Sequence, residues 1–404
     1  MQLQDGLNIL IVTPFSVEDF GGVSTAVLEL QQEFSKPPHT VRILAPSDSH
    51  RLESIGDCGV YGMYLRNIVV DSARIKGFVA FVIFFPVTLI RLWLFLRSHR
   101  IDVVQLQYPL PHMMYFAVLR RISRWKLVVT FQGNDAHNLY MLHGLNRRFL
   151  KSILAASDHI TGVATSLIEK VRNQFPDVKI ESTIVPNGAR AIATDANPDN
   201  SVDHTLPSNF VLTVGQLIYR KGIDVLIEAL AILKRGGSSI EVVAIGDGDE
   251  RTRFKQQAEE AGVSDRIHFV GWKPHDQVLL YMRRCVFFAL ASREEGLPLV
   301  IAEAMLLRKT AVATNVDGIP DIVVDGITGV LVPPDDPKAL AKAMSTVFRD
   351  KTLRHELEAR AYDHAMREFT WKAVGSQYLK LFRNCVSTAT TSAASNPDVR
   401  VKGL

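Results

Sequence analysis

The sequence predicts an α/β chain of two doubly wound domains. Short apolar runs of strand length alternate with helical stretches, and this alternation occurs twice along the 404 residues, on either side of a polar segment. The apolar runs are continuous, which is typical of parallel strands that helices cover on both faces. Two such series joined by a linker indicate two domains that face each other across a cleft.

The first domain is expected to span residues 1–190. It opens with an apolar run at 7–13, which a glycine pair at 21–22 separates from a helical stretch at 23–33. Five further strands are expected in this domain, at 41–44, 103–107, 127–131, 159–163 and 182–185.

A linker, a second domain and a C-terminal segment are expected to follow. Residues 191–208 are rich in Asp, Asn, Ser and Pro, a composition typical of a linker. The second domain, 209–370, is predicted to contain six strands, at 210–214, 241–245, 266–270, 286–290, 310–314 and 329–332. Residues 371–386 are predicted to form a helix that packs back on the first domain, and 387–404 are predicted to be a disordered tail.

The composition excludes several classes of protein. Apolar residues make up 47% and charged residues 22%, as in an ordinary globular protein. The net charge of +4 is too small to indicate a nucleic-acid partner. Cys58, Cys285 and Cys385 lie far apart in the sequence, so neither a disulfide framework nor a zinc site is expected. The N-terminus has no signal-peptide pattern, so a cytoplasmic protein is expected.

One apolar segment complicates that location. Residues 78–90 read FVAFVIFFPVTLI, a run of 13 residues that is shorter than a membrane-spanning helix requires. After Arg91 the chain continues with LWLFL and the basic residues Arg97, His99 and Arg100. Two interpretations stay open, a buried crossover helix or a helix that lies in the membrane interface, and a spanning helix is a third and weaker one.

Two glycine-containing turns follow strands at the edge where open α/β sheets bind ligands. Gly22 precedes a helix, whose N-terminus offers free N–H groups to a phosphate, although a tight structural turn explains this glycine equally well. In the second domain, GQLIYRKG at 215–222 places Arg220 and Lys221 beside a glycine. Two cations there suit a diphosphate, whereas an isolated basic pair is more often a solvated turn.

A second motif of the later domain carries two glutamates. Residues 295–303 read EGLPLVIAE, in which a Gly-Leu-Pro turn precedes a helix expected at 299–307. Glu303 then lies in the second or third turn of that helix. A carboxylate is a natural acceptor for the paired hydroxyls of a ribose, but the pattern alone allows Glu303 to be a surface residue.

Together these motifs resemble family 4 of the glycosyltransferases (group 1), which have the GT-B fold of two Rossmann-like domains. The resemblance extends from Leu7 to Phe382. The motifs follow the family's order and spacing: GGV at 21–23, PNG at 186–188, GQLIYRKG at 215–222, IGDGDE at 245–250, FVGW at 269–272 and EGLPLVIAEAM at 295–305. The glutamate pair with its EAM continuation is the most specific of them.

The resemblance implies a donor site. Lys221, assisted by Arg220, matches the cation that stabilises the departing nucleoside diphosphate; Glu295 matches the residue that faces the donor sugar. Glu303 matches the residue that holds the ribose hydroxyls. The other donor-binding positions that the resemblance implies are Gly22, Gln216, Gly246, Val270, Trp272, Gly296, Leu297, Pro298 and Leu299. Fixed cations and N–H donors at a leaving diphosphate lower the barrier, because negative charge develops there.

Two positions depart from the family's pattern. Gln216 stands where the family often has Arg, which removes one cation that Arg220 would partly replace. Gln132, in FQGND, stands where the family often has His; glutamine still bonds a sugar hydroxyl but does not titrate near neutral pH. Gln132, Asp135 and His137 are candidate acceptor-side residues, although His137 is more simply read as an exposed loop histidine.

A short acidic motif invites a metal assignment. Residues 247–249 read DGD, the DxD form that holds a metal in a different glycosyltransferase fold. Here the motif follows a second-domain strand and matches the family's GDG turn. We therefore expect neither a metal nor a cofactor.

The resemblance thus implies a retaining, metal-independent glycosyltransferase that transfers a hexose-like sugar from a nucleotide diphosphate sugar. The apolar segment adds the expectation of peripheral association with the inner face of the cell membrane and of a lipid-linked or cell-surface polysaccharide acceptor. Two alternatives stay open, a nucleotide-sugar epimerase of related fold and a non-catalytic nucleotide-sugar binding protein. A Rossmann-type oxidoreductase is less favoured, because the glycines at 21–22 fall short of the dinucleotide fingerprint.

Overall fold

The structure is a computed structural model in which the chain divides into two compact units. The first comprises Met1–Val185 and Val374–Leu404, and the second comprises Pro186–Ala373; the sequence placed these boundaries at residues 190 and 370. The structure describes residues 6–16, 21–47, 53–55, 59–65, 74–179, 181–190 and 206–394, with the backbone alone at 53–55, 74–80 and 388–394. The predicted linker lies almost wholly outside these ranges, as does Cys58.

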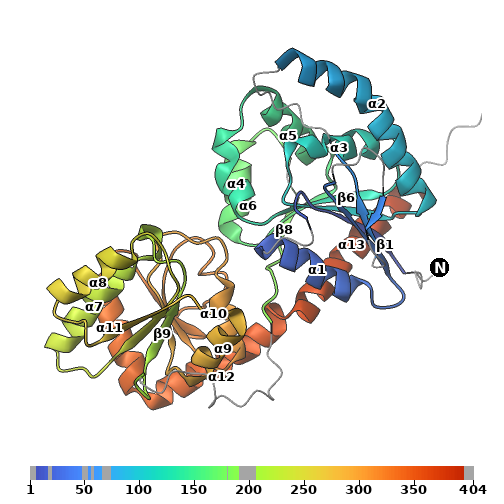
Figure 1. Cartoon of the computed structure of the whole chain (residues 1–404). Coiled ribbons are helices and arrows are strands. Elements are labelled where there is room, and N and C mark those ends of the chain that lie inside the picture. Colours follow the sequence, from blue (N-terminus) through green and yellow to red (C-terminus); the bar gives the residue numbers. More distant parts are fainter. Residues whose placement is uncertain are drawn as a thin grey trace, which may run out of the picture. The chain divides into compact units, whose positions relative to one another are not determined.

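The first unit is built on an eight-stranded sheet of order β3-β4-β2-β1-β5-β6-β7-β8 (Figure 1). All neighbouring strands are parallel except β3 and β4. The strands are β1 Asn8–Val12, β2 Thr40–Ala45, β3 Glu53–Ile55, β4 Val60–Gly62, β5 Val103–Gln107, β6 Lys126–Phe131, β7 His159–Gly162 and β8 Ser182–Ile184. The six predicted strands are confirmed, whereas β3 and β4 are too short to show a periodic pattern in the sequence.

Helices cover both faces of this sheet (Figure 1). Phe85 of α2 stacks on Tyr115 of α3 on one side, and Phe34 of α1 meets Tyr378 of α13 on the other. The helices of this unit are α1 Gly22–Phe34, α2 Arg74–Ser98, η1 Pro111–Met113, α3 Met114–Arg120, α4 Asn134–His137, η2 Asn138–Met141, α5 Gly144–Ala156, α6 Thr165–Gln174 and α13 Trp371–Ala394.

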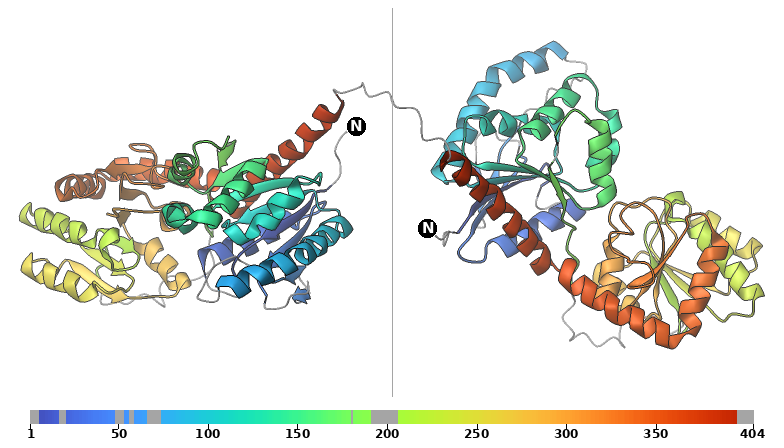
Figure 2. Two further views of the ribbon diagram at one scale, coloured as in Figure 1. Left: turned by 90° about the horizontal axis from the view of Figure 1, so that it is seen from above. Right: turned by 180° about the vertical axis from the view of Figure 1, so that it is seen from behind.

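The last helix, α13, packs against the first unit's sheet beside α1 (Figure 2). Its Tyr378 is fully buried, and the phenol hydrogen-bonds to the side chains of Gln105, Thr130 and Thr161. The helix reaches Ala394, so 387–394 are not the disordered tail that the sequence predicted. A helix already held by packing extends at little cost, because propagation needs no new nucleus. Residues 395–404 lie outside the described residues.

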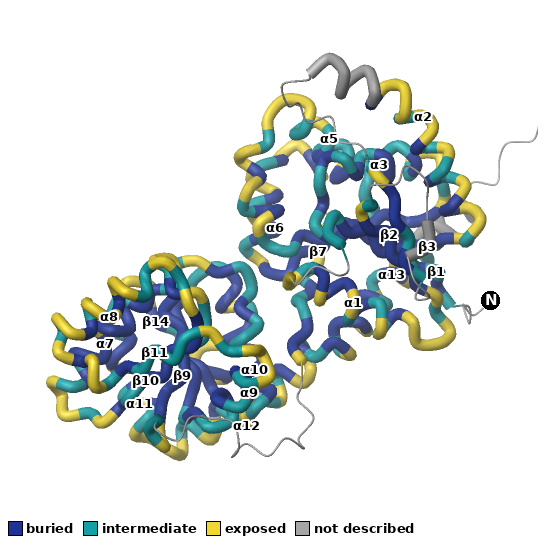
Figure 3. Tube along the Cα trace, viewed as in Figure 1, coloured by how far each residue is buried: buried dark blue, intermediate teal, exposed yellow. Residues whose placement is uncertain are grey.

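One apolar face of α2 is not covered by the first unit (Figure 3). Ile83, Val87, Ile90 and Leu94 are 61%, 40%, 57% and 53% exposed, and their spacing of four, three and four residues places them on one helical face. The opposite face is buried, and Phe81 of that face packs against Tyr115. The helix is therefore neither wholly core nor wholly exposed.

By length and composition, α2 also meets the criterion for a membrane span. The window Phe81–Ser98 has a mean hydropathy of 1.7 and is 28% buried within the unit. A core helix of a soluble protein passes the same criterion.

The second unit contains a six-stranded, fully parallel sheet of order β11-β10-β9-β12-β13-β14. Its strands are β9 Val211–Val214, β10 Val242–Ile245, β11 Ile267–Gly271, β12 Phe288–Leu290, β13 Ala311–Thr314 and β14 Gly329–Val332, which confirms all six predicted strands. Its helices are η4 Tyr219–Lys221, α7 Ile223–Arg235, α8 Arg251–Glu260, α9 His275–Arg284, α10 Leu299–Leu306, α11 Pro337–Arg349 and α12 Lys351–Glu368. Apolar cores fill both faces, one under α7, α8 and α11 and the other under α9, α10 and α12.

The strand order of the second sheet reverses between β9 and β12. The chain moves outward from β9 to β10 and β11 and then returns to the other side of β9 with β12. The loops after β9 (215–222) and after β12 (291–298) therefore leave the same carboxyl edge next to each other. Open α/β sheets bind ligands at such a reversal.

Candidate active site

A lysine and a glutamate from these two loops meet at the reversal. Nζ of Lys221 lies 2.5 Å from Oε1 of Glu295, and the two side chains are 16% and 6% exposed. The same carboxylate accepts a hydrogen bond from Oγ of Ser292, at 2.7 Å. The backbone N–H of Glu295 donates to Asp317. The sequence assigned Lys221 and Glu295 to parts of one ligand, and the structure brings them into direct contact with each other.

Two glycines allow the loops to approach so closely. Gly222 has φ +64°, and a Cβ on it would lie 1.9 Å from the carbonyl oxygen of Ala291 in the β12 loop. Gly246 has φ +140°, and a Cβ there would lie 1.9 Å from the carbonyl oxygen of Gly215. Larger residues would push the β9 loop away from its neighbours. Gly246 therefore has a packing role in addition to the donor-binding role that the sequence predicted.

Glu303 lies on α10 and is buried, so the surface interpretation of this residue is wrong. Its Oε1 accepts a hydrogen bond from Nε2 of His275, at 2.8 Å. Its Oε2 is buried and has no hydrogen-bond partner among the residues that the structure describes. A buried acceptor without a partner is rare in a folded protein, and two adjacent hydroxyls of a ligand would satisfy it.

His275 is a functional candidate that the sequence did not indicate. The hydrogen bond to Glu303 raises the pKa of His275 above its usual value, against the opposing effect of burial. Arg190 lowers that pKa and Asp276 raises it by smaller amounts. His275 and Glu303 are 28 positions apart on different helices, so only the packing of α9 against α10 reveals the pair.

The remaining predicted donor residues of the second unit lie in or next to the loops at the same edge of the sheet. Gln216 and Arg220 are exposed on the β9 loop. Trp272 follows β11 and leaves 71% of its surface exposed. Val270 lies within β11, and Gly296, Leu297, Pro298 and Leu299 lead into the first turn of α10. Gly22 begins α1 in the first unit, so the structure does not group it with these residues.

Of the three acceptor-side candidates in the first unit, Gln132 directly follows β6, and Asp135 and His137 lie on the one-turn helix α4. Nε2 of Gln132 donates to Gln107 at 2.5 Å, and His137 contacts Lys170 at 2.9 Å. Asp135 is buried and accepts hydrogen bonds from the backbone N–H groups of Gln132, Gly133 and Ala136. Burial raises the pKa of Asp135 to about 6. The carboxylate of Asp135 thus stabilises the backbone that follows β6.

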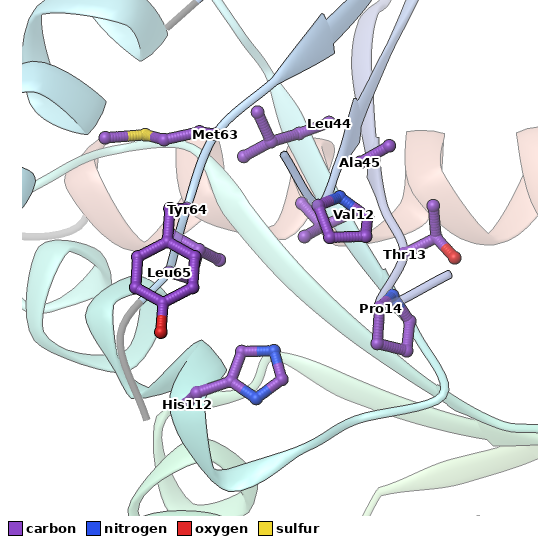
Figure 4. Close-up of a pocket in the computed structure, with 10 residues that line it drawn as sticks. Val12, Thr13, Pro14, Leu44, Ala45, Met63, Tyr64, Leu65 and His112 are labelled. Carbon is purple, nitrogen blue, oxygen red and sulfur yellow. The ribbon is translucent and has the colours of Figure 1, made fainter. Parts of the chain in front are cut away.

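A cavity of about 280 Å³ opens at the carboxyl ends of β1, β2 and β4 in the first unit (Figure 4). The described residues that line it are Val12, Thr13, Pro14, Leu44, Ala45, Pro46, Met63, Tyr64, Leu65 and His112. Most of them are apolar. Burial lowers the pKa of His112 to about 4, so its imidazole is neutral at physiological pH. The sequence did not indicate this cavity.

The DGD motif lies on an exposed turn. Oδ2 of Asp247 is 3.3 Å from Nη1 of Arg251, and Oδ1 accepts from the N–H of Gly248. Asp249 is exposed. Among the residues that the structure describes, no group of three His, Cys, Asp or Glu side chains is arranged to hold a metal ion.

Comparisons with known proteins agree with this geometry. Residues 20–190 match the family model of Glycosyltransferase Family 4, and residues 198–364 match that of Glycosyl transferases group 1. A phosphatidyl-myo-inositol mannosyltransferase of Mycobacterium leprae is 26% identical over 394 residues, which cover 95% of this chain and 98% of that protein.

Solved structures share the fold. Sucrose-phosphate synthase of Thermosynechococcus elongatus matches 95% of this chain and all of its own, with a TM-score of 0.69 and 19% identity. HepE of Anabaena, solved in complex with UDP, matches 94% of this chain with a TM-score of 0.70 and 17% identity, over 100% of its own length.

Two α/β units with largely parallel sheets, matched over nearly the whole chain by these solved structures, define a protein of the GT-B fold. This chain belongs to the group 1, family 4 glycosyltransferases. The family, the α/β fold class and the enzyme class inferred from the sequence are thereby confirmed. The epimerase and binding-protein alternatives are not favoured.

If Lys221 is the cation that faces the diphosphate, its replacement by alanine is expected to lower kcat by about 10²–10³-fold, because positive charge beside the leaving group is lost. Among the described residues Glu295 then keeps Ser292 as its side-chain donor, so the free energy of unfolding should fall by about 1–3 kcal/mol. Steady-state kinetics and urea unfolding measure the two effects. Lys234→Ala, which removes a lysine from an exposed pair with Asp265, is the control and should change neither. Wild-type turnover in a folded Lys221→Ala variant would contradict the assignment.

Glu303→Gln is expected to weaken binding of a nucleoside diphosphate by about 10–100-fold while the fold is kept, because a charged acceptor for hydroxyl groups becomes a neutral amide. Calorimetric titration with the ribose and 2′-deoxyribose forms of the ligand measures this loss. The wild type should discriminate between the two forms, and the variant should discriminate much less. Equal discrimination by both proteins would rule out a ribose contact at Glu303.

Proposed function

We propose that this protein is a retaining, metal-independent glycosyltransferase that moves a sugar from a nucleotide diphosphate sugar to a saccharide or lipid-linked acceptor. The observation that carries the proposal is the set of three charged groups at the strand reversal. Lys221 offers a cation to the diphosphate, Glu295 an acceptor to the sugar hydroxyls and Glu303 a buried acceptor to the ribose. Retention is proposed on the family resemblance of the motifs.

In this proposal, the diphosphate replaces Glu295 as the partner of Lys221. The released carboxylate of Glu295 keeps its hydrogen bond from Ser292 and turns to the hydroxyls of the sugar. When the bond from the sugar to the diphosphate breaks, the electron pair stays on the diphosphate. Lys221 and the exposed Arg220 stabilise that charge, which grows in the transition state.

HepE of Anabaena was solved in complex with UDP, which supports a nucleoside diphosphate as the donor's leaving group in this chain as well. Trp272 has an exposed indole that would stack on the base. A uridine or a guanosine donor fits these features equally well.

The test is a thermal-shift and turnover screen with uridine and guanosine diphosphate sugars, in the presence and absence of a metal chelator. The matching donor is expected to stabilise the protein by about 2.7 kcal/mol at a hundredfold excess over its dissociation constant. Slow release of nucleoside diphosphate without acceptor should accompany this shift and should be undiminished by the chelator, because Lys221 and Arg220 supply the positive charge.

Three outcomes of that screen would contradict the proposal in distinct ways. A changed free sugar released without acceptor would indicate an epimerase. A shift without any release of product would indicate a binding protein. Activity lost with chelator and restored by magnesium or manganese, and absent in Asp247→Asn with Asp249→Asn, would make those aspartates metal ligands.

For the acceptor and the place of action, we propose that α2 lies in the interface of an anionic membrane at the inner face of the cell membrane. Its exposed stripe (Ile83, Val87, Ile90 and Leu94) would enter the apolar boundary of the lipid. Residues 74–100 contain five Lys or Arg and no Asp or Glu, which suits anionic headgroups.

An interfacial position is favoured over a spanning one because the buried face of α2 belongs to the first unit. Phe85 stacks on Tyr115 with ring centroids 4.8 Å apart, and Phe95 meets Tyr61 at 4.9 Å. A spanning helix would have to give up these contacts and carry Arg91 into the hydrocarbon core.

Two observations support a lipid-linked acceptor. The relative from Mycobacterium leprae is named for a phosphatidyl-myo-inositol substrate. The cavity at the carboxyl ends of β1, β2 and β4 lies in the same unit as α2 and is lined mainly by apolar side chains, which suits an apolar part of an acceptor.

Vesicle co-sedimentation tests the membrane proposal. The wild type should sediment with vesicles that contain anionic lipid and should bind less at high salt, because each basic residue near the surface contributes about 1 kcal/mol. A triple variant with Ile83, Val87 and Ile90 changed to serine should stay in the supernatant while it keeps its fold and its donor hydrolysis. Ile327→Ser, which alters an exposed apolar residue of the second unit, is the control and should sediment as the wild type does.

Failure of the wild type to sediment with either vesicle type would contradict the proposal. Changing Phe81, Phe84 and Phe85 to serine is the complementary test of the core interpretation. Phe81 is buried and Phe85 is half-buried, so that variant should lose stability whether or not lipid is present.

A further inference from the structure

Arg293 joins the two loops that form the donor site. It lies on the β12 loop, and its guanidinium reaches Asp224 at the start of α7 through two hydrogen bonds of 2.9 and 2.7 Å. Nη1 also donates to the carbonyl oxygen of Tyr219, at 2.6 Å. Nε donates to Asp335, at 2.7 Å. The side chain of Arg293 thus binds both the short helix η4 and the start of α7.

Two more contacts fix the short helix η4, Tyr219–Lys221. The guanidinium carbon lies 3.9 Å from the centre of the Tyr219 ring, a cation–π distance. The backbone N–H of Arg293 donates to the carbonyl oxygen of Arg220, at 2.8 Å. A three-residue helix has few internal hydrogen bonds, so contacts from outside determine its conformation. Arg293 supplies one cation–π contact and two hydrogen bonds to the backbone carbonyls of η4.

The charge of Arg293 is already balanced. Its side chain is 13% exposed, and it pairs with Asp224, which is equally shielded, and with Asp335, which is 59% exposed. The hydrogen bond to Asp224 and the charges of both carboxylates raise the pKa of Arg293, so the group stays cationic. A guanidinium that two carboxylates neutralise is a poor partner for a diphosphate. Its role is therefore one of geometry.

We propose that Arg293 is a positioning residue that holds η4 so that Lys221 and Arg220 face the diphosphate. This inference rests on the proposed function of the donor site. Arginine is required because its planar fork binds a carboxylate through two N–H groups while it also reaches a carbonyl and stacks on a ring. Lysine would keep the charge but only part of this geometry.

Kinetics of three variants test the proposal. Arg293→Met is expected to lower kcat about 10–100-fold with a smaller change in the KM for the donor, because small displacements of a catalytic cation cost that much. Arg293→Lys should fall between Arg293→Met and the wild type. Arg354→Met is the matched control; Arg354 is 12% exposed and donates to the carbonyls of Val347 and Phe348, so its loss should lower the melting temperature but leave kcat and KM unchanged.

A double-mutant cycle separates positioning from general destabilisation. Because Arg293 is proposed to position both Lys221 and Arg220, Arg293→Met should cost a Lys221→Ala enzyme less activity than it costs the wild type. The proposal would be overturned if the double variant lost activity by the product of the two single losses. It would also be overturned if Arg293→Met had the same kcat and KM as Arg354→Met. If Arg293→Met does not fold, the same cycle with Arg293→Lys decides.

The same assays distinguish this failure from failure of the proposed function. A wild type that turns over a nucleotide sugar, together with an unimpaired Arg293→Met, overturns the positioning role alone. A wild type that binds and turns over no nucleotide sugar overturns both.

Discussion

A salt bridge between two loops of one parallel sheet is the interaction on which the rest of the active site depends. Lys221 and Glu295 come from strands that are neighbours only because the strand order reverses between β9 and β12. Removing both charges from water is costly, and mutual attraction with a further hydrogen bond from Ser292 offsets that cost. Gly222 and Arg293 keep the loops at the distance this contact needs.

The same arrangement explains why a ligand can enter without leaving a charge unpaired. Before the donor binds, the shielded charged groups of the site have internal partners: Lys221 pairs with Glu295, and Oε1 of Glu303 accepts a hydrogen bond from His275. In the proposed mechanism the diphosphate takes the place of Glu295 beside Lys221, sugar hydroxyls bind the released Glu295, and ribose hydroxyls bind Oε2 of Glu303. Because the protein groups already have fixed positions, exchanging their partners for ligand groups needs little rearrangement of the site. Preorganised sites stabilise developing charge in this way.

The sequence was informative wherever a residue's role depends on its neighbours along the chain. Continuous apolar runs predicted twelve strands correctly, and the motifs at 215–222 and 295–305 pointed to Lys221, Glu295 and Glu303. It was uninformative where a role depends on contacts between distant segments. The pairing of Lys221 with Glu295 spans 74 positions, and Arg293 meets Asp224 across 69. No local pattern encodes either contact. The carboxylate of Asp135 accepts hydrogen bonds from its neighbours along the chain, and its acceptor-side role stays a prediction.

The position of Tyr378 has a consequence for the order in which the protein is completed on the ribosome. Its phenol hydrogen-bonds to three buried polar side chains of the first unit's sheet, yet it emerges only after the whole second unit has been synthesised. The second unit is continuous in sequence and can close its sheet as soon as its last strand appears. The unit that is translated first is thus the last to be completed. Until α13 has been synthesised, the sheet face that it covers is exposed to chaperones and to association with other chains.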